Sequence, residues 1–133
     1  MAKASGLGQT TLSVDDSAGT PVDIRNDVTN WQMATPRGVQ DTTGVDKSAN
    51  ERLLLLADGS VTLNGVFNAT GAHLVFRTVP STSVNRTTTQ TVNGVTLAME
   101  LLYSDYQLSR SDSGELTWSA PGSLANGAVP TWA

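Results

Sequence analysis

The sequence contains no cysteine, and this absence excludes several classes of protein that depend on this residue. Without cysteine there is no disulfide framework to staple the fold, and no thiolate to act as a nucleophile or a metal ligand. Charged residues are also scarce, at 15% of 133 residues. Much of the remaining polar surface must come from Thr, Ser and Asn. A surface with so few charges is poorly defended against association, so the composition favours a protein that assembles.

Basic residues are outnumbered, which leaves a net charge of −4 and a pI of about 4.6. This balance argues against a protein that binds nucleic acid tightly through its phosphates. A negatively charged surface is still compatible with a protein that nucleic acid passes without binding. The first ten residues lack the apolar centre of a signal peptide, and no apolar run approaches the length of a membrane span. We therefore expect synthesis and folding in a cytoplasm and no membrane partner.

Catalytic side chains are equally sparse. His73 is the single histidine, so any Ser-His-Asp arrangement or histidine metal site depends on it, and its position suggests an ordinary rim residue. Asp15 and Asp16 lie in a turn-like segment that lacks the later Glu of a calcium loop. Asp41 and Asp46 flank Gly44 in a polar stretch where nothing in the sequence buries them. We expect no enzyme, no cofactor and no metal.

Residues 48–67 carry the clearest local signals. Ser48 and Glu51 have the spacing of a capping box, the following leucines recur at helical spacing, and Asp58-Gly59 provides a stop. These features predict one short α-helix over residues 49–57. Alternating apolar positions from Val61 to Phe67 then predict a half-buried strand.

The rest of the chain is predicted to form short strands joined by turns. Asn93-Gly94 is the strongest hairpin signal, and residues 72–79 are predicted to be another strand. We expect a single domain over residues 1–133: an antiparallel β-sandwich or partly closed barrel with one flanking helix. A flexible arm (residues 1–8), a long polar loop (35–47) and an extended arm (121–133) complete this prediction.

The stretch from Asp41 to Asn68 resembles the middle of the tail tube (major tail) proteins of long-tailed bacteriophages. The family pattern D-G-x-V-x-L-x-G-x-F is present as Asp58, Gly59, Val61, Leu63, Gly65 and Phe67. The end of the chain is similar to the family's G-x-V-x-W close, with Gly127, Val129 and Trp132 and with Pro130-Thr131 inserted before the tryptophan. The resemblance implies a β-sandwich with a flanking helix that assembles into hexameric rings, which stack into a virion tube with one sheet lining the channel for the genome.

The resemblance and the sequence together predict two groups of site residues. Subunit contacts are expected from the three exposed segments and from tryptophans, because Trp often anchors interfaces. The interface candidates are Trp31, Pro36, Arg37, Val39, Asp41, Val45, Leu124, Val129 and Trp132. The channel-facing candidates are Thr87, Thr89 and Thr91, which lie in a segment polar on both faces.

The expected partners are further copies of the chain, other tail proteins at the tube ends, and phage DNA that passes without specific binding. Two other functions remain open at this stage. Trp31, Trp118 and Trp132 could serve a monomeric carbohydrate-binding module, although Trp118 alternates like a core residue. A capsid decoration protein of similar size would instead bind heads.

Overall fold

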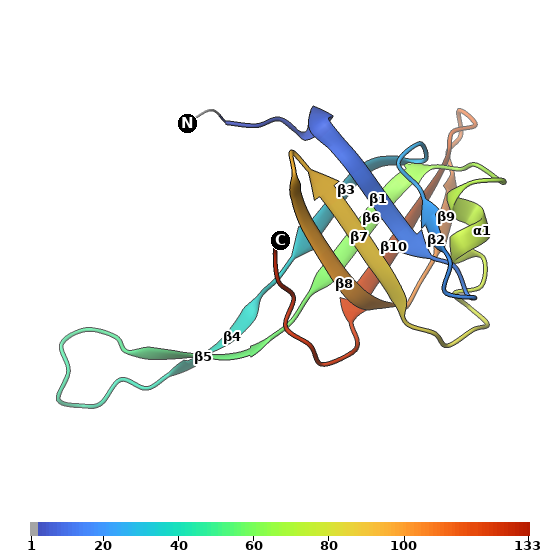
Figure 1. The fold of residues 1–133 in the computed structure, drawn as a ribbon. Coiled ribbons are helices and arrows are strands. Elements are labelled where there is room, and N and C mark those ends of the chain that lie inside the picture. Colours follow the sequence, from blue (N-terminus) through green and yellow to red (C-terminus); the bar gives the residue numbers. More distant parts are fainter. Residues whose placement is uncertain (1–2) are drawn as a thin grey trace.

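The chain folds around one antiparallel sheet, in a computed structural model that describes residues 3–133 (Figure 1). The elements in chain order are η1 (Gly6–Gly8), β1 (Gln9–Asp15), β2 (Pro21–Asp23), β3 (Val28–Ala34), β4 (Arg37–Asp41), β5 (Arg52–Ala57), β6 (Ser60–Val66), α1 (Ala72–Phe76), β7 (Arg86–Val92), β8 (Val95–Tyr103), β9 (Gln107–Arg110) and β10 (Leu116–Leu124). The eight-stranded sheet has the order β2-β1-β7-β8-β10-β6-β3, and β9 pairs with β10. The sheet is not closed into a barrel, because β3 at one end does not pair with β1 or β2.

One face of the sheet carries the core. Inward side chains such as Leu12, Leu63, Leu97 and Leu101 are fully buried, and alternate positions on the same strands face outward. The Asn93-Gly94 turn between β7 and β8 has both residues at positive φ, 52° and 80°, as the hairpin signal predicted. The mainly antiparallel β fold with one short helix is confirmed.

The position of the helix is wrong in the sequence prediction. Residues 52–57 form strand β5, which pairs with β4 in a separate two-stranded ribbon. The capping box does not form, because the backbone N–H of Glu51 donates instead to the Thr43 hydroxyl across the ribbon, at 2.8 Å. A short apolar run is compatible with the period of a helix and with that of a strand. The pairing with β4 therefore decides that residues 52–57 form a strand.

The helix lies instead at Ala72–Phe76, within the segment predicted as a strand. Ala72, Val75 and Phe76 are buried, which is the i, i+3, i+4 spacing of a helix face. Asp27 holds the start of α1: its buried carboxylate accepts from the backbone N–H of Ala72 at 2.8 Å. Phe76 then packs against Tyr103 and Trp118, so the helix covers one end of the core.

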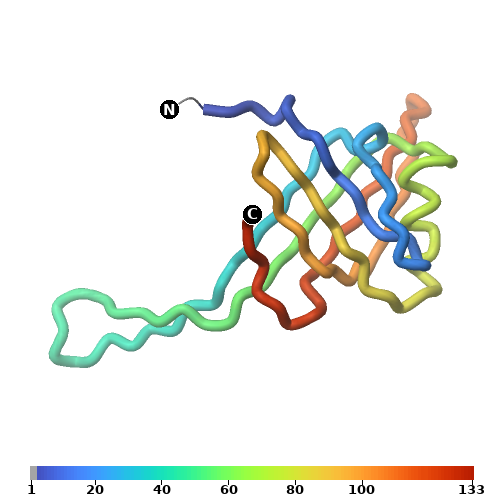
Figure 2. Tube along the Cα trace, in the orientation of Figure 1, coloured from blue at the N-terminus to red at the C-terminus, as the bar shows by residue number. Residues whose placement is uncertain are grey.

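The β4–β5 ribbon continues β3 and β6 outward and stands away from the body of the protein (Figure 2). The predicted long loop over residues 35–47 is therefore wrong in part, because it contains β4. The ribbon begins where the backbone N–H of Asp58 donates to the Pro36 carbonyl, at 2.9 Å. Within the described residues, no helix is long and apolar enough to cross a membrane.

Candidate assembly surfaces

The projecting ribbon exposes an unusual amount of apolar side chain. Leu53, Leu54, Leu55 and Leu56 are between 44% and 90% exposed, although each is a residue that normally lies in a core. Large exposed apolar patches are typical of surfaces on which proteins associate, so these leucines are candidates for a contact surface. The sequence prediction missed these leucines as surface residues, because it placed them on the buried face of a helix.

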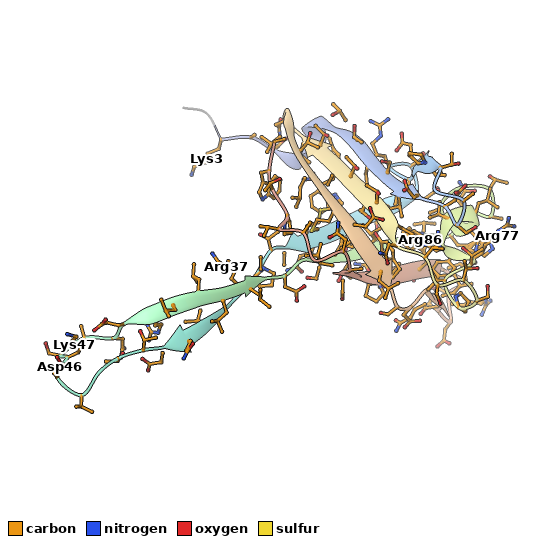
Figure 3. All side chains as sticks on the ribbon, turned by 60° about the horizontal axis from the view of Figure 1, so that its bottom comes forward. Lys3, Arg37, Asp46, Lys47, Arg77 and Arg86 are labelled. Carbon is orange, nitrogen blue, oxygen red and sulfur yellow. The ribbon has the colours of Figure 1, made fainter. Side chains whose placement is uncertain are left out.

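Polar contacts fix the far end of the ribbon. The carboxylate of Asp41 accepts from the backbone N–H of Thr43 at 2.9 Å and from its hydroxyl at 2.6 Å. These hydrogen bonds hold the pKa of Asp41 below its ordinary value, since they favour the charged form. Figure 3 shows Asp46 and Lys47 at this far end, where Lys47 pairs with Asp46 at 3.3 Å. The end of the ribbon is thus a defined structure.

Five of the predicted interface residues come together on this ribbon or at its base. Arg37, Val39 and Asp41 belong to β4, Pro36 precedes it, and Val45 lies fully exposed in the turn. The Nε–H of Arg37 donates to the carbonyl of Leu55 at 2.9 Å, which ties the two strands of the ribbon together. The ribbon therefore presents the predicted residues and the missed leucines as one surface.

The remaining interface candidates lie on the body. Trp31 and Trp132 line the same groove, and the indole N–H of Trp31 donates to Gln9 at 2.9 Å. Leu124 ends β10 and packs against the core of its own chain, while Val129 is 67% exposed. The last residues run back along β8, where Thr96 and Ala133 exchange two backbone hydrogen bonds of 2.9 Å. Trp118 is buried, as its alternation predicted.

The outward face formed by β6, β7, β8 and β10 is mostly polar and almost uncharged. Thr87, Thr89 and Thr91 all point to this face, since Arg86, Thr88 and Gln90 between them are buried. The neighbouring outward positions on β6, β8 and β10 are Ser60, Thr62, Asn64, Val66, Thr96, Ala98, Glu100, Leu102, Thr117, Ser119, Pro121 and Ser123. Among the outward side chains of these four strands, Glu100 alone is charged, and it accepts from the Thr87 hydroxyl at 2.7 Å.

The chemistry of a conventional active site is not assembled on the described residues. His73 lies on α1 with its Nδ1 3.1 Å from the hydroxyl of Tyr106, and two aromatic rings, Phe67 and Tyr106, pack beside it. Asp41 and Asp46 are occupied with Thr43 and Lys47 at the far end of the ribbon. No cluster of three metal-ligating side chains occurs in residues 3–133.

An open antiparallel sheet, a projecting ribbon with exposed leucines and an almost uncharged polar face are the main surface features of the described residues. No protein-family model matches the sequence, and no curated protein matches it. Among solved structures, a chain from "Tail of empty GTA particle computed with helical refinement, C6 symmetry" is similar, with a TM-score of 0.71 and 14% identity. A chain from "Virion of native gene transfer agent (GTA) particle" is similar with a TM-score of 0.68 and 13% identity. Each similarity covers 92% of this chain and 95% of the other, so the whole fold is shared.

Proposed function

We propose that the chain is a structural subunit of a virion tail, which assembles into hexameric rings that stack as a tail tube and conduct the genome. The carrying observation is the shared fold with a chain of a C6-symmetric tail over 92% of the length. The protein acts by geometry and not by catalysis. Its partners are further copies of itself, tail proteins at the tube ends, and DNA within the channel.

Two features of the described surface support this proposal. The outward face with Thr87, Thr89 and Thr91 suits a channel wall, because hydroxyl groups hydrate well and carry no positive charge to hold phosphates. The ribbon with Pro36, Arg37, Val39, Asp41 and Val45 suits contacts with a neighbouring ring, because it extends beyond the body of the subunit (Figure 1). The exposed Val129 and Trp132 would add contacts nearby.

The first experiment is negative-stain electron microscopy of the purified protein at high concentration, with light scattering on the same sample. We expect rings or hollow tubes with a central channel, and scattering masses in multiples of six subunits. A protein that remains a monomer at every concentration, also after addition of tube fragments as seeds, contradicts the proposal. Glycan binding by such a monomer would instead favour a carbohydrate-binding module, and attachment to phage heads would favour a decoration protein.

A further inference from the structure

The sheet is open between β1 and β3, and both strands have unpaired edge positions at this gap. On the side away from β7, β2 pairs with β1 at Ser13, Val14 and Asp15 and leaves the first residues of β1 without a neighbouring strand. In residues 3–133, β3 pairs with β6 on one side and with no strand on the other. The hydrogen bond from Trp31 to Gln9 bridges this gap.

A groove of about 680 Å³ occupies the gap. Its lining is largely apolar and includes Leu7, Leu12, Val28, Trp31, Val95 and Trp132. Arg25 is the single charged residue of the lining, and its guanidinium is already paired with Asp23 at 2.9 Å. The groove therefore fits an uncharged, apolar segment with main-chain groups free to pair with strand edges.

Gln90 in the lining of this groove supplies an independent observation. The three buried residues of β7 are all polar, and two of them are satisfied: Arg86 donates to Thr78 and to the Asp15 carbonyl, and Thr88 bonds to Tyr103. Gln90 is 1% exposed, and its Oε1 has no partner among the described residues. A buried acceptor without a donor costs about 1–3 kcal/mol, so an N–H group arriving in the groove would recover that cost.

We propose that the groove receives strand β5 from a second copy of the chain. β5 has one edge paired with β4, and its other edge pairs with no strand in the described residues. Its leucines are uncharged and exposed, which matches the apolar lining of the groove. The ribbon stands away from the body, so it does not fold back onto the groove of its own chain (Figure 2).

The two surfaces differ from each other, so the contact is head to tail. Each copy offers one β5 strand and one groove, and a head-to-tail contact between different surfaces generates rings or open stacks. An inserted strand would place alternate leucines toward the groove and bring its N–H groups close to the part of the lining where Gln90 is buried. This inference rests on the proposed function, and it assigns the contact between copies to β5 and the groove.

Cross-linking tests the contact directly, since the native chain has no cysteine. A Val28→Cys subunit is mixed with a Leu54→Cys or a Leu55→Cys subunit, which sample the two faces of β5, and the assembled mixture is oxidised. We expect a disulfide-linked dimer with at least one of them. Leu108→Cys, exposed on β9, is the matched control and should give no dimer with Val28→Cys. Rings or tubes in which neither leucine variant is linked overturn this inference and leave the proposed function standing; no assembly at all overturns both.

Gln90→Leu gives a second readout that separates folding from assembly. Removing the unpartnered oxygen should raise or preserve the melting temperature of the isolated subunit, while loss of the intermolecular hydrogen bond should raise the concentration needed for assembly about tenfold. Thr88→Val, which breaks a satisfied hydrogen bond of 2.6 Å, should do the opposite: lower stability without a matching shift in assembly. A Gln90→Leu subunit that assembles at the wild-type concentration contradicts the inference.

Discussion

At the scale of single residues, the polar side chains inside the sheet determine how the core tolerates change. Tyr103 shows the principle: it is buried, its hydroxyl lies 2.6 Å from that of Thr88, and its ring packs edge-on against Phe76. Burial raises the pKa of Tyr103 far above its ordinary value of 10.0, because the phenolate would lie in an apolar surrounding. Its proton is therefore held more tightly in the folded state than in the unfolded chain.

This difference predicts a loss of stability at high pH. Above pH 10 the unfolded chain releases the proton of Tyr103 while the native state keeps it, so the free energy of unfolding falls, by up to about 1.4 kcal/mol per pH unit. Tyr103→Phe should cost about 1 kcal/mol near neutral pH through the lost hydrogen bond, yet decline less steeply above pH 10. Urea unfolding between pH 8 and pH 11 measures both slopes. Equal slopes for the two proteins would contradict the burial argument.

Gly65 occupies a second position where the fold restricts the choice of residue, because only glycine fits there. A Cβ atom at this position would lie 1.8 Å from the carbonyl oxygen of Asp27 and 2.8 Å from the indole nitrogen of Trp118. Both neighbours are held in place, since the Asp27 carbonyl accepts from Val66 and the Trp118 indole donates to the Val66 carbonyl. The close approach of β6 to the turn before β3 therefore depends on glycine.

Gly65→Ala should consequently destabilise the subunit by roughly 3 kcal/mol or more, because the backbone must separate to admit the methyl group. Gly6→Ala is the matched control, as no atom lies within 4 Å of the added Cβ, and it should leave stability nearly unchanged. Thermal or chemical unfolding compares the two variants. A loss of less than 1 kcal/mol for Gly65→Ala would show that the backbones of β6 and Asp27 can separate at little cost, and would contradict this prediction.

At the scale of elements, the ribbon is the part that the body does not need. It pairs with itself, and its leucines contribute no buried residue to the core. The backbone contacts at its base, from Asp58 to Pro36, lie at the end of the ribbon nearest the sheet. Folding and assembly should therefore be separable by removing this element.

Replacement of residues 37–57 by a two-residue Asn-Gly turn joins β3 to β6 as an ordinary hairpin. We expect a soluble monomer with a melting temperature within a few degrees of the native subunit, because the core is intact, and no rings or tubes. A milder variant with serine at Leu53 and Leu55 should weaken assembly in the same direction. Size-exclusion light scattering and thermal unfolding measure the two effects. If the shortened chain still forms normal tubes, the ribbon is not required for assembly and this prediction is wrong.

The elements also show which parts of the fold are readable from the sequence. Alternation identified β6, and Asn93-Gly94 identified the hairpin that joins β7 to β8, because the turn residues there have one strongly favoured conformation. The run of four leucines in β5 carries no unique period, and its outcome was decided by a partner strand more than ten residues away. The helix α1 has a local signal in the spacing of Ala72, Val75 and Phe76, but its start is held by Asp27, 45 residues distant, and that contact could not be read from the sequence.

The groove could not be predicted from the sequence, because its lining comes from residues that lie far apart in the chain. Trp31 and Trp132 were both predicted to make subunit contacts, but 101 positions separate them in the sequence, and only the topology shows that they line one groove. Gln90 gave no signal, since a glutamine in a Thr-rich strand reads as a surface residue and becomes notable only when its oxygen is buried without a donor.

At the scale of the whole molecule, the two faces of the sheet differ in chemistry, and the proposed tube would use each face for a different purpose. The inner face builds a core with α1, and the outer face of β6, β7, β8 and β10 is rich in hydroxyl groups, with Glu100 as its one charged side chain. In a tube this outer face would meet DNA, and it would do so without basic side chains from β6, β7, β8 or β10. An acidic subunit with such a face can enclose nucleic acid without retaining it.

The orientation of that face is testable with a cysteine at Thr89, at the centre of β7. In assembled tubes, Thr89→Cys should react with a small maleimide but be protected from a maleimide carried on a particle wider than the channel. The same variant as an unassembled subunit is the control, and both reagents should label it equally. Labelling is read by mass spectrometry after dissociation. Equal reaction of both reagents with intact tubes would place β7 on the outside, and the channel wall would then have to be sought on another face of the subunit.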